Sequence, residues 1–159
     1  MKRLALHTGI LMMTLIIFSA CKKSSTPPTV QETQLSKLTK TWTLSSVELD
    51  GVNKKDANNY NNFKLTFSGT YSASNPDASY SYSVSGRPAL SAWPANGDFK
   101  FGASSPETQL VRDPDSADQL NMTYSISGSP AVLTLTFTYS GTGYSRTAEV
   151  NGQWVMTFN

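Results

Sequence analysis

Cys21 and His7 carry most of the reactive chemistry of this chain, because each is the only residue of its type. A thiol is a nucleophile and can hold a thioether-linked group, whereas histidine is the usual general base and metal ligand. A single cysteine cannot form a disulfide within the chain. We therefore expect stability to come from packing and strand pairing alone.

The segment before Cys21 has the three parts of a secretory signal. A basic start (Lys2-Arg3) precedes an apolar run over residues 4–18, and the small residues Ser19-Ala20 follow. The apolar run of about 15 residues is shorter than the roughly 20 that a membrane-spanning helix needs. We therefore predict cleavage after Ala20, directly before Cys21, so that residues 1–20 are removed together with the histidine.

The chain after residue 20 has no recognisable catalytic set. It contains no histidine, no Gly-x-Ser-x-Gly turn and no Ser-x-x-Lys pair, so nothing would activate a serine. Asp113, Asp115 and Asp118 are close in sequence, but a Ca²⁺ site needs about six to eight oxygens and usually a glycine, which this run lacks. We expect a solvated acidic loop, no catalytic residue, no metal and no cofactor. The protein is predicted not to be an enzyme.

Five aromatic residues could contact a ligand or fill a core. Trp42 and Trp154 alternate with polar residues, which favours core packing. Trp93 precedes a proline in a predicted loop, and Tyr139 and Tyr144 flank a glycine-rich turn. We treat Trp93, Tyr139 and Tyr144 as candidate ligand contacts, with closure of one end of the fold as the alternative for the two tyrosines.

The charge of the cleaved chain excludes one class of partner. The sequence has 13 basic and 11 acidic residues, and the excess is Lys2 and Arg3, which leave with the signal. A nucleic-acid-binding protein needs a basic surface. We therefore expect no nucleic-acid partner.

A polar linker follows the predicted cleavage site. Residues 21–33 are rich in Lys, Ser and Thr, and Pro27-Pro28 stiffens them. Gln31 to Leu38 could form a short helix that packs Leu35 and Leu38 on the domain, or could continue the linker. We place the folded domain at residues 34–159.

From Thr39 onward, apolar and polar residues alternate with period two, which is typical of half-buried strands. The apolar parity changes within the first strand, so we predict a β-bulge near Ser45-Ser46. Turn residues separate eight candidate strands, at residues 41–49, 63–67, 80–84, 99–101, 108–111, 119–126, 133–139 and 154–158.

This pattern predicts an all-β fold, an eight-stranded antiparallel up-and-down barrel. Closure into a barrel removes exposed strand edges, and an eight-stranded barrel either fills itself or holds one small ligand. We expect the apolar face of the strands to form the core, including Trp42, Phe67, Leu135, Phe137 and Trp154.

Two parts of the chain resemble known protein classes. Ser19-Ala20-Cys21 resembles a bacterial lipobox, in which a peptidase cuts before a cysteine that then carries lipid. The region from Leu38 to Phe158 resembles the lipocalin-like domains of small lipoproteins from Bacteroidetes-type bacteria. The motifs that carry this second resemblance are Leu38-Thr39-Lys40-Thr41-Trp42, Asp50-Gly51-Val52, Phe63-Lys64-Leu65-Thr66-Phe67, Trp93-Pro94, Leu133-Thr134-Leu135-Thr136-Phe137 and Asn151-Gly152-Gln153-Trp154.

These resemblances imply a location and a kind of function. Lipid on Cys21 would hold the protein in the cell envelope, at the outer membrane and facing the periplasm, with surface exposure left open. The domain would be non-catalytic and would bind a small apolar ligand or an envelope protein. The alternative is a structural lipoprotein with a fully packed barrel and no ligand.

Asp115-Ser116-Ala117 resembles the O-glycosylation signal of the same bacteria, in which Asp precedes Ser or Thr and a small or apolar residue follows. Pro114 and the nearby carboxylates predict a solvated segment that a transferase can reach. We therefore regard Ser116 as a candidate glycan acceptor, although so short a motif also arises by chance.

Overall fold

The computed structural model describes residues 26–141 and 150–159. The predicted signal peptide, Cys21 and Tyr144 lie outside the described residues. No helix within the described part of the chain is both long and apolar enough to cross a membrane.

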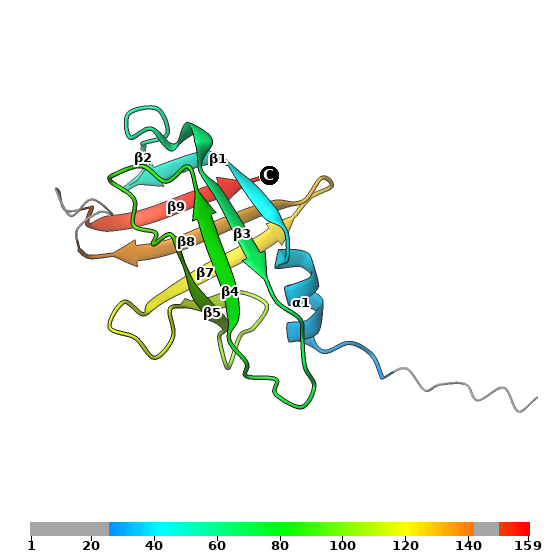
Figure 1. Ribbon diagram of the computed structural model, residues 1–159. Helices are drawn as coiled ribbons and strands as arrows, with labels where there is room; N and C mark the ends of the chain where they lie inside the picture. The colour runs from blue at the N-terminus through cyan, green and yellow to red at the C-terminus, as the bar shows by residue number, and fades with distance from the viewer. Residues whose placement is uncertain (1–25, 142–149) are drawn as a thin grey trace, which may run out of the picture.

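Eight antiparallel strands form a closed barrel in which each strand pairs with the next along the chain and the last pairs with the first (Figure 1). The predicted barrel is confirmed. The strands are β1(Thr41–Leu49), β3(Lys64–Ser68), β4(Tyr80–Ser85), β5(Asn96–Phe101), β6(Gln109–Arg112), β7(Leu120–Ser127), β8(Val132–Tyr139) and β9(Gly152–Phe158). A two-residue strand, β2(Val52–Asn53), pairs only with the end of β1, and η1(Tyr60–Asn62) is a short 3₁₀ turn.

The predicted bulge in β1 is confirmed. Leu44 pairs with Phe158 of β9, but the next pair is Ser46 with Thr157, so one residue of β1 has no partner in this register. Before the extra residue the even-numbered side chains Trp42 and Leu44 face the interior, and after it the odd-numbered Val47 does. All three are therefore buried.

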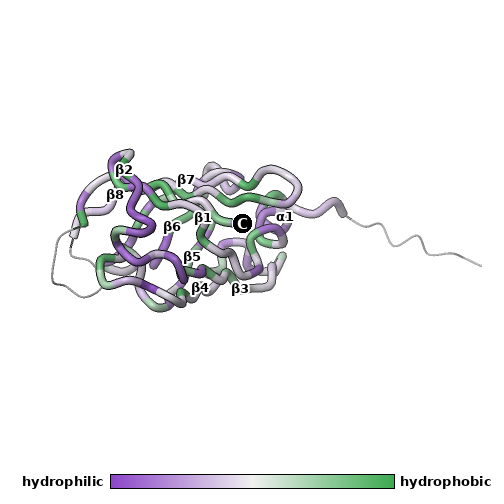
Figure 2. Tube along the Cα trace, turned by 90° about the horizontal axis from the view of Figure 1, so that it is seen from above, coloured by the Kyte–Doolittle hydropathy of each residue, from purple (hydrophilic) through white to green (hydrophobic). Residues whose placement is uncertain are grey.

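The helix α1(Val30–Leu38) precedes the barrel and lies against its end at the start of β1 (Figures 1 and 2). The Thr29 side chain accepts a hydrogen bond from the Glu32 backbone N–H at 3.1 Å, which caps the first turn. Leu35 and Leu38 are buried, as expected of the helical alternative. The helix begins at Val30 and so occupies part of the segment expected to be linker.

The barrel interior is an aromatic core. Ring contacts run between strands that do not pair with each other, such as Phe67 on β3 with Phe99 on β5, whose centroids are 4.9 Å apart. The residues predicted to form the core are all 3% exposed or less, namely Trp42, Phe67, Leu135, Phe137 and Trp154. This confirms the predicted strand faces.

Candidate functional site

Trp93, one of the candidate ligand contacts, lies in the loop between β4 and β5, as expected. Its side chain is 1% exposed and points into the barrel. The indole ring meets Tyr82 edge-on at 5.3 Å and Phe137 at 6.1 Å between centroids, and its Nε1–H donates to the Met156 sulfur at 3.2 Å. Trp93 therefore spans the lumen from β4 to β8 and β9.

Two side chains from other elements and one from the loop itself hold this loop in the barrel. Arg112 donates from Nη1 to the Ala92 carbonyl at 2.8 Å, and Arg87 donates to the Trp93 carbonyl at 3.0 Å. Tyr60 of η1 donates to the Leu90 carbonyl at 3.1 Å. Three successive parts of the loop backbone are thus bound, which fixes the position of the indole.

Arg112 is the buried cation of this site, with 2% of its surface exposed. Its guanidinium lies 5.2 Å from the Trp93 ring centroid, within cation–π range, and its Nε donates to an Asp113 carboxylate oxygen at 3.0 Å. A buried arginine without a counter-ion would be strongly destabilising, so the adjacent carboxylate is required.

The expected solvated acidic loop is confirmed for Asp115 and Asp118, which are exposed, but not for Asp113, whose carboxylate is largely buried and hydrogen-bonded. The residue adopts a left-handed conformation (φ 48°) directly after β6, which turns the carboxylate back toward the barrel. It accepts hydrogen bonds from Tyr82 Oη at 2.8 Å, from Arg112 Nε and from the Asp98 backbone N–H at 3.2 Å. Gly97 leaves the necessary space, since a Cβ there would overlap Asp113 and Tyr82.

Burial raises the pKa of Tyr82 far above its ordinary value, and the hydrogen bond to Asp113 raises it further. The phenol thus remains neutral and a hydrogen-bond donor throughout the physiological range. In the arrangement of Arg112, Asp113 and Tyr82 the polar groups are satisfied: the carboxylate is paired with the guanidinium, and the phenol donates its hydrogen bond to that carboxylate.

Sequence reasoning missed Arg112 because the predicted strand ended at Val111. One signal was available, since Arg112 has the same parity as the buried Leu110 and therefore points inward if the strand continues. The inward direction of Trp93 had no comparable signal, because a loop has no periodicity.

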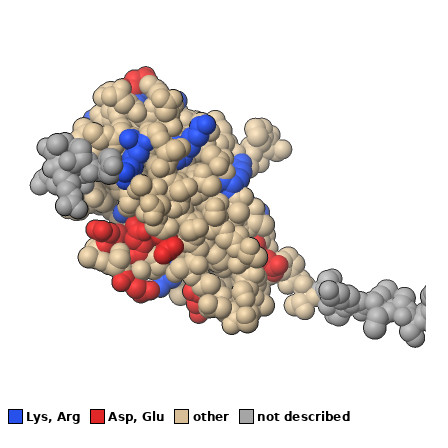
Figure 3. Space-filling model, viewed as in Figure 1, with Lys and Arg blue, Asp and Glu red and all other residues tan. Residues whose placement is uncertain are grey.

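The candidate glycan acceptor, Ser116, lies in the exposed loop between β6 and β7. Acidic side chains gather in this region, at the lower left in Figure 3. Ser116 Oγ donates to the Asp113 carbonyl at 2.7 Å and accepts from the Asp118 N–H at 3.1 Å. The side chain is reachable but belongs to a local turn, and glycosylation stays a prediction that the intact mass of the protein from its native host would test.

Tyr139 is partly buried at the end of β8 and packs against the core. Its place agrees with closure of one barrel end, and contact with a ligand stays a prediction for both Tyr139 and Tyr144. Among the described residues, no group of three or more His, Cys, Asp or Glu side chains could hold a metal ion.

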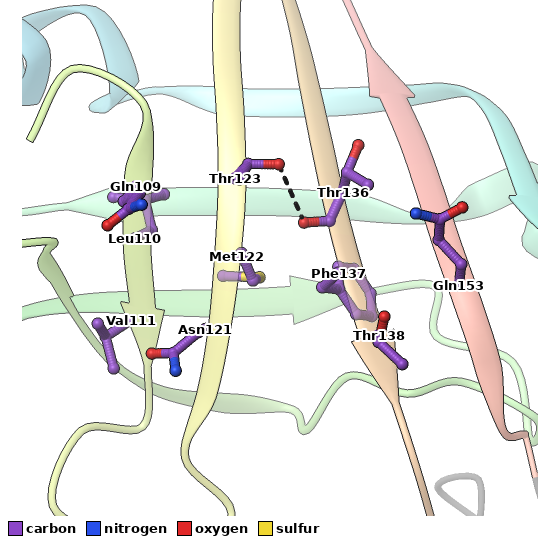
Figure 4. Close-up of a pocket in the computed structure, with 10 residues that line it drawn as sticks. All are labelled: Gln109, Leu110, Val111, Asn121, Met122, Thr123, Thr136, Phe137, Thr138 and Gln153. Atoms are coloured by element: carbon purple, nitrogen blue, oxygen red, sulfur yellow. Dashed lines mark hydrogen bonds between the residues drawn. The ribbon is translucent and has the colours of Figure 1, made fainter. Parts of the chain in front are cut away.

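A groove of about 470 Å³ lies on the outer surface of the sheet, over β6, β7, β8 and β9 (Figure 4). Its outward-facing lining consists of uncharged polar side chains and the half-buried Val111, and the buried residues Met122 and Phe137 lie at its floor. Sequence analysis did not identify this surface, since its outward-facing threonines and amides are spread over four strands.

The chain matches no known family model, no curated protein sequence and no solved structure. The closed eight-stranded antiparallel barrel is consistent with a lipocalin-like domain.

Proposed function

We propose that this protein is a lipid-anchored, non-catalytic lipoprotein of the cell envelope whose barrel is filled by its own side chains and whose contacts are made from the outer surface. The observation that carries this proposal is the position of Trp93. Its indole occupies the lumen where a lipocalin-like barrel would hold a small apolar ligand.

The hydrogen bonds around the loop support a permanent closure. The Leu90 and Ala92 carbonyls accept from Tyr60 and Arg112, which lie outside the loop, and the Trp93 carbonyl accepts from Arg87 within it. Arg112 is itself paired with Asp113. Opening the loop would leave a buried guanidinium with fewer partners, which costs several kcal/mol. A ligand would have to provide that free energy before it could enter.

The position of α1 supports a role close to the membrane. The helix begins at Val30, so only a short polar segment separates it from Cys21. A flexible segment of this length spans roughly 15 Å. Lipid on Cys21 would therefore hold the barrel near the bilayer surface, at the outer membrane and on the periplasmic side in our proposal.

Native mass spectrometry of the full chain, purified from its host membranes, tests the filled interior. We expect the mass of the lipidated chain, with or without a glycan, and no non-covalent companion. A stoichiometric apolar molecule that leaves on collisional activation would instead support ligand storage in the barrel.

Metabolic labelling with palmitate tests the anchor separately. Cys21→Ala should abolish incorporation, because no other residue can carry a thioether-linked lipid. Ser19→Thr, which keeps Cys21, is the matched control and should retain the label. Equal labelling of wild type and Cys21→Ala would disprove the anchor.

A further inference from the structure

The groove on the outer surface exists because two neighbouring strands separate. β7 and β8 pair from Ser127 with Val132 as far as Thr123 with Thr136, and their register ends there. Beyond that point β7 continues to Leu120 alongside β6, whereas β8 continues to Tyr139 alongside β9. Figure 4 shows the two strands moving apart below Thr123 and Thr136.

The side chains along this opening share one chemistry. All are neutral, and the polar ones are amides or hydroxyls that face outward from four strands: Gln109, Asn121, Thr123, Thr136, Thr138 and Gln153. The lack of charge extends beyond the groove, because β7, β8 and β9 contain no Asp, Glu, Lys or Arg.

From this lining we infer that the groove binds a neutral oligosaccharide, an inference that rests on the proposed function because it places binding on the outer surface. A side-chain amide both donates and accepts hydrogen bonds, as a sugar hydroxyl does, so amides and threonine hydroxyls can pair with a ring in several orientations. The volume of about 470 Å³ lies within the usual range for small-molecule sites.

Other ligand classes fit this lining less well. A charged ligand would lose hydration and find no counter-ion on the three strands. An apolar ligand would cover the amides of Gln109, Asn121 and Gln153 without giving them partners, which is unfavourable. A neutral ligand rich in hydroxyls satisfies these groups, and the half-buried side chain of Val111 can contact the carbon face of a ring.

The test is a titration of the full ¹⁵N-labelled chain with three neutral probes, maltohexaose, cellohexaose and hexa-N-acetylchitohexaose, in a detergent without a sugar head group. We expect at least one probe to shift backbone amide signals of Asn121, Thr123 and Thr138. An oligogalacturonate of matched length is the charged control and should leave them unchanged.

Two variants locate the site. Asn121→Ala and Gln153→Ala should each weaken binding by roughly three- to tenfold, the effect of one hydrogen bond. Ser125→Ala, also exposed on β7 but outside the groove, is the matched control and should bind as wild type. Both positions are exposed, so the variants should fold normally.

The same spectra separate failure of this inference from failure of the proposed function. No shift with any of the three probes at millimolar concentration, or equal binding by both groove variants and wild type, would overturn the oligosaccharide site alone. A probe that shifts the indole N–H signal of Trp93 and leaves the groove signals in place would show binding inside the barrel, and would overturn both.

Discussion

Tyr80 and Tyr82 lie two residues apart on the inward face of β4, yet their hydroxyl groups have opposite surroundings. Tyr82 donates to the Asp113 carboxylate, which also pairs with Arg112. Within the described part of the protein, the buried hydroxyl of Tyr80 has no hydrogen-bond partner. A buried polar group without a partner is destabilising, whereas a hydrogen bond to a charged group is among the stronger ones.

Replacing each tyrosine by phenylalanine should therefore give opposite results. Tyr82→Phe should lower the free energy of unfolding by about 1.5–3 kcal/mol, because a hydrogen bond to a carboxylate is lost. Tyr80→Phe removes only an unpaired hydroxyl, so the free energy should stay unchanged or rise. Urea unfolding of the two variants measures both, and an equal loss for Tyr80→Phe would show that its hydroxyl has a partner.

Alkaline pH should destabilise the fold through its buried phenols. Burial raises the pKa of Tyr60 to about 12, from an ordinary value of 10.0, and also raises the pKa of Tyr82 and Tyr124. The unfolded chain then loses protons first as the pH rises, so stability is full below pH 10 and falls between pH 10 and pH 12.

Tyr60→Phe isolates the contribution of one phenol. It should reduce the loss of unfolding free energy over that interval by about 2–3 kcal/mol. Urea titrations at the two ends of the interval, for wild type and variant, give this difference. An equal loss of unfolding free energy between pH 10 and pH 12 in wild type and Tyr60→Phe would mean that Tyr60 ionises as readily in the folded protein as in the unfolded chain.

At the scale of the elements, the inward and outward faces of the strands could be predicted from the alternation of apolar and polar residues. The prediction was correct even in β1, where the buried parity changes at the bulge. The period of two carries this information, because successive side chains of a strand point to opposite faces. The loop between β4 and β5 could not be predicted, since its position depends on hydrogen bonds from Tyr60 and Arg112, which are distant in sequence. The outer groove depends on the residues at which β7 and β8 stop pairing, and the alternation of apolar and polar residues along each strand does not predict that point.

The register of β8 predicts that alanine substitutions at two neighbouring positions have very different effects on the free energy of unfolding. Phe137 is 3% exposed and stacks on Trp154, so Phe137→Ala should cost about 3–5 kcal/mol of unfolding free energy. Thr136 faces the outer surface, and Thr136→Ala should change the free energy of unfolding by no more than about 0.5 kcal/mol. Thermal melts compare the two, and equal losses would place the strand one residue out of register.

At the scale of the whole molecule, the described part of the barrel presents an interior packed with buried aromatic and aliphatic side chains, and two different outer regions. Figure 3 shows basic side chains above and acidic side chains below on one face. Strands β7 to β9 have no charged residue. The closed barrel could be predicted from the even spacing of the strands, but whether its lumen was filled or hollow could not. That difference depends on one side chain, Trp93, whose loop turns inward.

A titration with the apolar fluorophore N-phenyl-1-naphthylamine tests this central claim most directly. The barrel segment, residues 26–159, avoids lipid and detergent, both of which would take up the dye. We predict no saturable binding by the wild-type sequence or by Trp93→Phe, which keeps a ring in the lumen. Trp93→Ala should acquire one site, because removal of the indole leaves a cavity beside Tyr82, Phe137 and Met156 that can accept an aromatic ring. Stoichiometric binding of the dye by the wild-type barrel would contradict a filled interior.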